Sequence, residues 1–99
     1  PKNNPLVLTI TTLFRYFLNL LTYHYQKKTT PNTQEMARLL GVHPFFMKDY
    51  IDGGKIYNAM KCATTISLLR EYDMKSKGVG NANISDGELL KELIFKIMH

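Results

Sequence analysis

The sequence lacks the features that mark several large classes of protein. It has one cysteine, Cys62, which excludes an internal disulfide framework and is compatible with the cytosol. No apolar run reaches the roughly 18 residues of a membrane span, because Arg15 and Asn19 interrupt the best candidate, Leu6–Leu21. No signal peptide, internal repeat or low-complexity segment can be recognised. We therefore expect a cytoplasmic protein that does not associate with a membrane.

Length and composition predict one folded domain. Its 99 residues form one domain at most, residues 1–99, and suffice for a modest core. Hydrophobic residues make up 44% and charged residues 21%, as in globular proteins. The chain opens on Pro1 rather than Met, so we expect it to be excised from a longer protein. The net charge of +5 is spread along the sequence, which is typical of a solvated surface more than of a nucleic-acid footprint.

Apolar residues at spacings of three and four predict a long first helix. Asn4-Pro5 reads as an N-cap followed by proline at the first helical position, and the helix should run to about Lys28. The alternative at its start is a short strand through Thr9–Thr12, where β-branched residues follow one another. The apolar band is wide, with Val7, Leu18 and Tyr25 beside the main stripe, and so indicates contacts on more than one side.

Caps and glycines predict four further helices and no strand. The expected segments are Thr33–Leu40 after a cap at Asn32 or Thr33, Pro44 to about Tyr57, Ala59–Lys77 after Asn58, and a last helix after Ser85. Ser85 and Glu88 form a capping box, and residues 78–83 should be a loop. Gly54 falls on the inner face of the third helix, and Ala59, Cys62 and Ala63 on that of the fourth. The fold class is therefore an all-α bundle of about five helices.

No catalytic, cofactor or metal site is visible in the sequence. His24, His43 and His99 have no cysteine or carboxylate at ligand spacing, so they read as structural residues. Asp73 and Lys77, four apart on a helix, predict a surface ion pair. Cys62 lies among apolar neighbours and predicts an inert core thiol. We expect a non-enzymatic protein.

The segment Thr33–Tyr50 gives two signals that disagree. Its first half is typical of a helix-turn-helix, a motif of DNA-binding regulators. Its second half places Phe45, Phe46 and Met47 where a DNA reader carries side chains that hydrogen-bond to bases. Buried against protein, three large apolar side chains gain far more than they would facing DNA. The segment therefore favours packing, either inside the domain or against a neighbour, and the DNA-binding regulator is the alternative.

Four segments stand in order along the sequence and at compatible spacing: Asn4-Pro5 with Leu13–Phe17, Met36–Phe45 around Pro44, Leu68–Asp73 with Lys77-Gly78, and Glu88–Ile94. Together they resemble the C-terminal domain of the bacterial DNA polymerase III delta subunit, a component of the clamp loader. Two departures affect helix boundaries: Gly53-Gly54 stands where better helix formers are expected, and residues 78–83 lengthen the last loop.

The resemblance implies a small helical collar domain that joins equivalent domains of the other clamp-loader subunits, delta prime and gamma/tau. It implies that the sliding clamp is gripped by an N-terminal domain absent from this sequence. It also implies that this subunit hydrolyses no ATP and meets DNA at most indirectly. We thus expect a non-catalytic oligomerisation domain used in DNA replication. Its candidate packing or interface residues are Phe14, Phe17, Phe45, Phe46, Met47, Leu90 and Ile94, and its motif residues are Pro44, Asp73 and Lys77.

Overall fold

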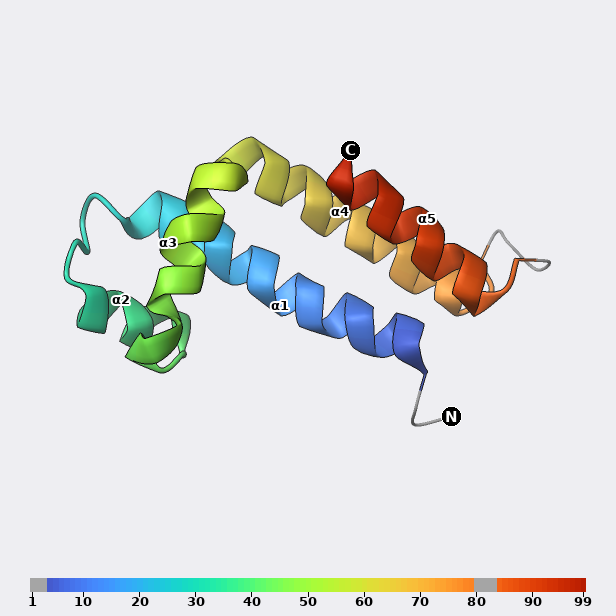
Figure 1. The fold of residues 1–99 in the computed structure, drawn as a ribbon, viewed down its shortest axis with the longest axis horizontal. Coiled ribbons are helices and arrows are strands. Elements are labelled where there is room, and N and C mark those ends of the chain that lie inside the picture. The colour runs from blue at the N-terminus through green and yellow to red at the C-terminus, as the bar shows by residue number, and fades with distance from the viewer. Residues whose placement is uncertain (1–3, 80–83) are drawn as a thin grey trace.

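The computed structural model describes residues 4–79 and 84–99 and shows an all-α protein (Figure 1). Its elements in this part of the chain are α1 (Pro5–Gln26), α2 (Thr33–Leu40), the 3₁₀ turn η1 (Pro44–Phe46), α3 (Met47–Ile56), α4 (Ala59–Ser76) and α5 (Asp86–Met98). The predicted class and helix order are confirmed. The alternative of a strand at Thr9–Thr12 is wrong, because these residues lie inside the capped helix α1. Residues 80–83 of the predicted loop lie outside the described residues.

The helices are arranged along α1 (Figure 1). α4 runs antiparallel to α1, and α5 turns back along α4, so these three helices form one half of the molecule. α2, η1 and α3 lie at the other half, around the C-terminal end of α1. The molecule measures 48 × 27 × 17 Å, with a radius of gyration of 15.1 Å. A compact domain of this length has a radius of gyration of about 13 Å. The elongation leaves much apolar surface outside the core.

Side-chain caps begin four of the five α-helices, at residues that the sequence predicts. Asn4, Asn32 and Asn58 each accept a hydrogen bond from a backbone N–H in the first turn of the following helix. The predicted box between Ser85 and Glu88 is formed, with each side chain accepting from the other residue's backbone N–H. The caps therefore fix where these helices begin through contacts between residues close together in the sequence.

Each helix contributes one buried face to a continuous core. The buried apolar residues are Leu6, Ile10, Phe17, Leu20, Met36, Ala37, Leu40, Met47, Tyr50, Cys62, Ile66, Leu69, Tyr72, Leu89, Leu93 and Ile97. On α4 the predicted inner residue Ala63 is exposed, and Thr65 is buried instead. This difference arises because α4 packs on α1 and α5 together, so its buried face is rotated towards Thr65 and Tyr72.

A glycine allows α3 to approach α1 closely. Gly53, not the predicted Gly54, is the buried glycine of α3, and a Cβ at this position would overlap the Tyr16 hydroxyl. That hydroxyl donates a hydrogen bond to the backbone oxygen of Asp49 at 3.3 Å. The Tyr16 ring also stacks on Tyr50, with 5.2 Å between the centroids. Gly54 faces Tyr23 less closely, although a Cβ there would still lie 3.1 Å from a ring carbon, inside ordinary van der Waals distance.

By length and composition, α1 could cross a membrane, which differs from the expectation drawn from Arg15 and Asn19. The helix has 22 residues, and its mean hydropathy reaches 1.3 although Arg15 and Asn19 interrupt the apolar sequence. A core helix of a helical domain has the same properties. Here α1 contributes Leu6, Ile10 and Phe17 to the protein core.

Replacing Gly53 with Ala should lower the free energy of unfolding by about 1–2 kcal/mol. The added methyl displaces the stacked Tyr16 ring, and such overpacking exceeds the gain of about 1 kcal/mol in helix propensity. Urea denaturation followed by circular dichroism measures the change. Gly87→Ala is the matched control, because its nearest contact is Ser85 Oγ at 4.0 Å. This variant should gain about 0.4–1 kcal/mol, and equal effects of the two substitutions would contradict the proposed close approach.

Candidate protein-interaction surfaces

The turn between α2 and α3 presents two aromatic rings to solvent. Gly41 ends α2 in the left-handed conformation, with φ of 71°. His43 then caps η1, its Nδ1 accepting from the backbone N–H of Phe45 at 3.0 Å, and Pro44 opens the turn. The rings of Phe45 and Phe46 pack edge to face, with 5.4 Å between their centroids. This hydrogen-bonded turn fixes the direction in which the aromatic pair projects.

The three residues expected to pack against protein divide into two kinds. Met47 is 2% exposed and belongs to the domain core. Phe45 is 80% exposed and Phe46 is 50% exposed, so the domain covers little of Phe45 and about half of Phe46. The exposed pair is the first candidate interaction surface, because large apolar side chains gathered on a surface commonly mark a contact site.

The charges beside the aromatic pair do not suit contact with phosphates. On α3, Lys48 forms an ion pair with Asp52 one turn later, and the exposed Asp49 lies between them. The ion pair lowers the pKa of the Asp52 carboxyl and raises that of the Lys48 amine. The exposed side of α3 therefore offers no excess positive charge.

The outer face of α5 forms a second apolar surface. Leu90 is half-buried, while Ile94 is more exposed and lies one turn further along. Phe95 and Met98 are 63% and 68% exposed, and neither is among the interface residues predicted from the sequence. Together with Lys91 and His99 these residues line a shallow groove of about 490 Å³. The sequence signal for this surface is that the last helix has apolar residues on both faces, whereas one small core can bury only one of them.

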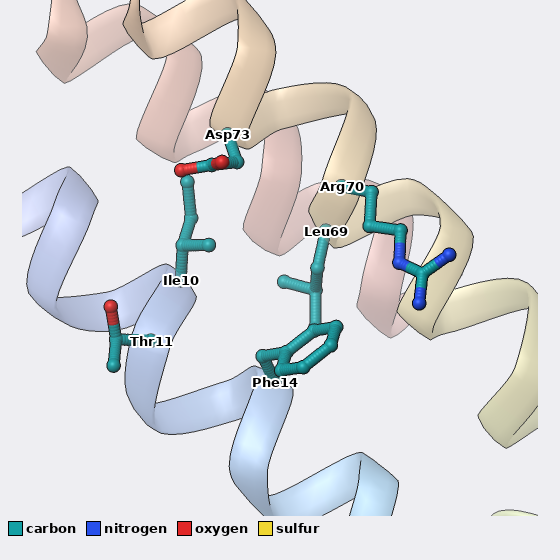
Figure 2. Close-up of a pocket in the computed structure, with 6 residues that line it drawn as sticks. All are labelled: Ile10, Thr11, Phe14, Leu69, Arg70 and Asp73. Atoms are coloured by element: carbon teal, nitrogen blue, oxygen red, sulfur yellow. The ribbon is translucent and has the colours of Figure 1, made fainter.

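A third surface is a groove between α1 and α4 (Figure 2). It has a volume of about 280 Å³ and is lined by Ile10, Thr11, Phe14, Leu69, Arg70 and Asp73. Phe14 is half-buried and forms part of the floor. Phe17, three residues further along α1, is buried and belongs to the core, so it is not available as an interface residue. Of the seven candidate residues, Phe17 and Met47 are therefore core residues.

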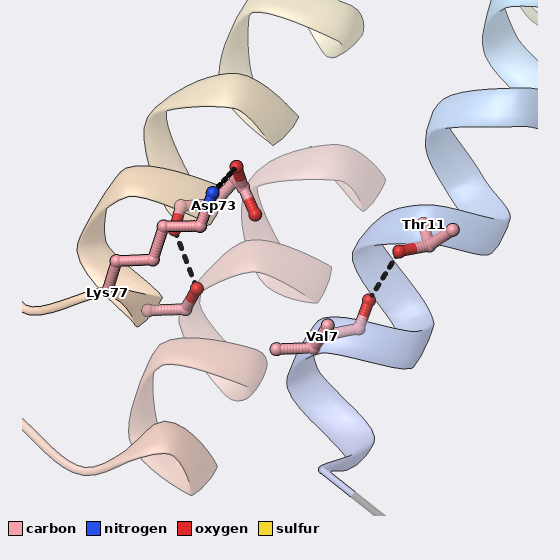
Figure 3. A network of polar contacts seen from close by, with 5 residues as sticks. Val7, Thr11, Asp73 and Lys77 are labelled. Carbon is pink, nitrogen blue, oxygen red and sulfur yellow. Dashed lines mark hydrogen bonds and ion pairs between the residues drawn. The ribbon is translucent and has the colours of Figure 1, made fainter. Parts of the chain in front are cut away.

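The motif residues Asp73 and Lys77 form the predicted ion pair (Figure 3). Lys77 Nζ lies 3.0 Å from Asp73 Oδ2, and both side chains are substantially exposed. The backbone oxygen of Asp73 also accepts a hydrogen bond from Ser76 Oγ at 2.6 Å. Such a pair contributes about 0.3–0.5 kcal/mol. It pairs the Asp73 carboxylate with a positive charge beside the groove.

The remaining reactive side chains have structural roles. His24 Nε2 lies 2.7 Å from the backbone oxygen of Tyr57, linking the end of α1 to the turn before α4, as expected for a partly exposed structural histidine. Cys62 is buried, and desolvation raises the pKa of its thiol. Within residues 4–79 and 84–99, no group of three or more metal-ligating side chains gathers in one place. The surfaces described above are thus the candidate functional sites of the described residues.

Comparison with protein-family models, with curated proteins and with solved structures finds no match for this chain.

Met47→Ala and Phe45→Ala should have different effects on folding stability, because one residue is buried and the other is exposed in the same segment. Truncating the buried methionine should cost about 2–5 kcal/mol of folding stability. Truncating the exposed ring should change stability by no more than about 0.5 kcal/mol. Denaturation midpoints of both variants measure the difference. A large loss for Phe45→Ala would mean that the ring packs within its own domain.

The Cys62 thiol should be unreactive in the folded protein. Its burial raises its pKa and excludes solvent, so little thiolate is available for disulfide exchange. Mixing the native protein with Ellman's reagent at pH 8 should give almost no absorbance change over minutes. Addition of denaturant should then release one equivalent of the coloured thiolate per chain, because the single cysteine becomes accessible. Rapid reaction without denaturant would show that the site opens readily.

Proposed function

We propose that the chain is a non-catalytic oligomerisation domain of a clamp-loader subunit similar to the DNA polymerase III delta subunit. In this role it would hold its parent protein in the cytoplasmic complex that loads a sliding clamp during DNA replication. The observation that carries the proposal is the exposed pair Phe45 and Phe46, presented by a hydrogen-bonded turn. The resemblance in sequence supports a setting for this pair in a collar of helical domains.

The energetics favour a protein partner for the aromatic pair. Burial of an exposed phenylalanine side chain contributes about 1.5–3 kcal/mol. Aromatic residues are also enriched in the buried centres of protein interfaces. A partner that covers Phe45 and Phe46 would gain this energy without rearranging the domain, because η1 already fixes the position of both rings.

The expected partners are the delta prime and gamma/tau subunits, through their own collar domains. The outer face of α5, with Leu90 and Ile94, is available for the same purpose. Contact with the sliding clamp belongs to the N-terminal domain that the resemblance implies, outside this sequence. No step of ATP hydrolysis is assigned to this domain.

Co-purification with the delta prime and gamma/tau subunits of the same organism tests the proposal. The wild-type chain should elute with them in size-exclusion chromatography. The double variant Phe45→Ser, Phe46→Ser should bind at least about tenfold more weakly, the equivalent of losing one buried ring. Met60→Ser is the control, because Met60 is also largely exposed but lies on α4. Its affinity should equal that of the wild type.

Duplex DNA provides the opposing test. A helix-turn-helix regulator would bind duplex DNA with submicromolar affinity and a steep dependence on salt concentration. The aromatic pair and the acidic residues of α3 favour weak binding instead. Tight, salt-sensitive binding together with no association with clamp-loader subunits would overturn the proposal in favour of the regulator.

A further inference from the structure

The α1–α4 pair is open on the side that carries the groove of Figure 2. In the figure, Leu69 points from α4 towards Phe14 on α1, with Ile10 beside them and the polar groups of Arg70 and Asp73 along the α4 edge. Leu69 is fully buried at the bottom, whereas Phe14 is half-buried and accessible. The site is thus an apolar floor with charged groups on one rim.

The volume of the groove identifies the size of its occupant. Pockets for small molecules usually measure about 300–1,000 Å³ and enclose most of the ligand. At about 280 Å³, this groove lies at the lower limit of that range. One large apolar side chain matches it better than a complete metabolite, which points to a protein partner.

An apolar stripe on α1 extends the groove over the length of a helix. Val7, Phe14, Leu18 and Tyr25 are separated by seven, four and seven residues, so they lie on one side of α1. Val7 and Leu18 are each more than two-fifths exposed, and Tyr25 is more exposed still. At 1.5 Å per residue, the stripe spans about 27 Å. A stripe of this length and periodicity fits a second helix lying alongside.

The charges on the rim select an acidic partner. Asp73 is already paired with Lys77, and among the described residues Arg70 takes part in no ion pair. The Arg70 guanidinium lies 5.9 Å from the centroid of the Phe14 ring, within cation–π range, and so stands at the groove. α1 carries no acidic residue, and the net charge of the chain is +5. The groove therefore offers one accessible positive group beside an apolar floor.

We propose that the groove between α1 and α4 binds an amphipathic helix of a partner protein. This helix inserts one large apolar side chain beside Phe14 and Leu69 and places a carboxylate on Arg70. The inference specifies the kind of partner for the interaction role proposed above and rests on that role.

Titration with 3-phenylpropionate, followed by the amide resonances of the ¹⁵N-labelled chain, tests the site without any partner subunit. The probe combines an aromatic ring and a carboxylate. Its shifts should concentrate at residues 10–14 and 69–73, with binding about two- to fivefold tighter than that of neutral 3-phenylpropanol, as expected for one partly exposed ion pair. Arg70→Gln should abolish the preference, whereas Arg38→Gln, the same charge change on α2, should keep it. Equal binding of the two probes to the wild type, or shifts outside the groove, would overturn the proposal.

A second measurement separates this proposal from the proposed function. In co-purification with the clamp-loader subunits, Arg70→Gln should weaken association about two- to fivefold and Arg38→Gln should not. An assembly that forms equally well with Arg70→Gln overturns the helix-docking role while leaving the collar proposal in place. If the chain prefers the acidic probe but binds no clamp-loader subunit, the groove proposal stands and the collar proposal is contradicted.

Discussion

The structure depends on the packing of α1, since every other α-helix contacts it. α1 is about 33 Å long, so the other helices are distributed along it rather than gathered around one centre. This explains the 48 Å length and the 17 Å thickness of the molecule. It also explains why the apolar band of α1 is wider than one core requires, because different parts of its circumference face different helices. The same arrangement leaves the groove beside α4 uncovered.

The two ends of α1 are held by different means. At its N-terminal end, the side-chain amide of Asn4 both caps α1 and donates a hydrogen bond to Asp86 in the first turn of α5, at 2.8 Å. At the other end, His24 Nε2 lies 2.7 Å from the backbone oxygen of Tyr57, and halfway along the helix the missing side chain of Gly53 allows α3 to press against Tyr16. Between α4 and α5, the buried Tyr72 donates a hydrogen bond to Glu92 at 2.7 Å, which satisfies its hydroxyl in the core. Polar contacts therefore fix the mutual register of helices that apolar packing alone would leave free to slide.

The sequence predicted the local features of this fold well, because caps and helix boundaries depend on residues close together in the chain. Asn32, Asn58 and the Ser85 box all act as their spacing indicated. Predictions that depended on the neighbours of a helix were less accurate. Ala63 and Thr65 are two positions apart on α4, and only the placement of α5 decides which of them is buried. Gly53 and Gly54 likewise differ by one position, and the crossing of α3 over α1 selects between them. Phe45, Phe46 and Met47 are consecutive, yet the change from 3₁₀ turn to α-helix directs Met47 inwards and leaves both rings outside.

The surfaces left by this packing differ in place and in chemistry, which bears on the kind of assembly they suit. The aromatic pair adjoins α2 at one end of the long axis, whereas the outer face of α5 lies in the other half of the molecule (Figure 1). The aromatic pair consists of rings alone, α5 adds Lys91, and the groove beside α1 adds Arg70. One partner of ordinary size covers about 800 Å² of a protein surface, so surfaces in opposite halves of an elongated domain are suited to separate neighbours. Under the proposed function, a domain built in this way would contact two neighbours at once, and the presence or absence of charge beside a surface would distinguish them.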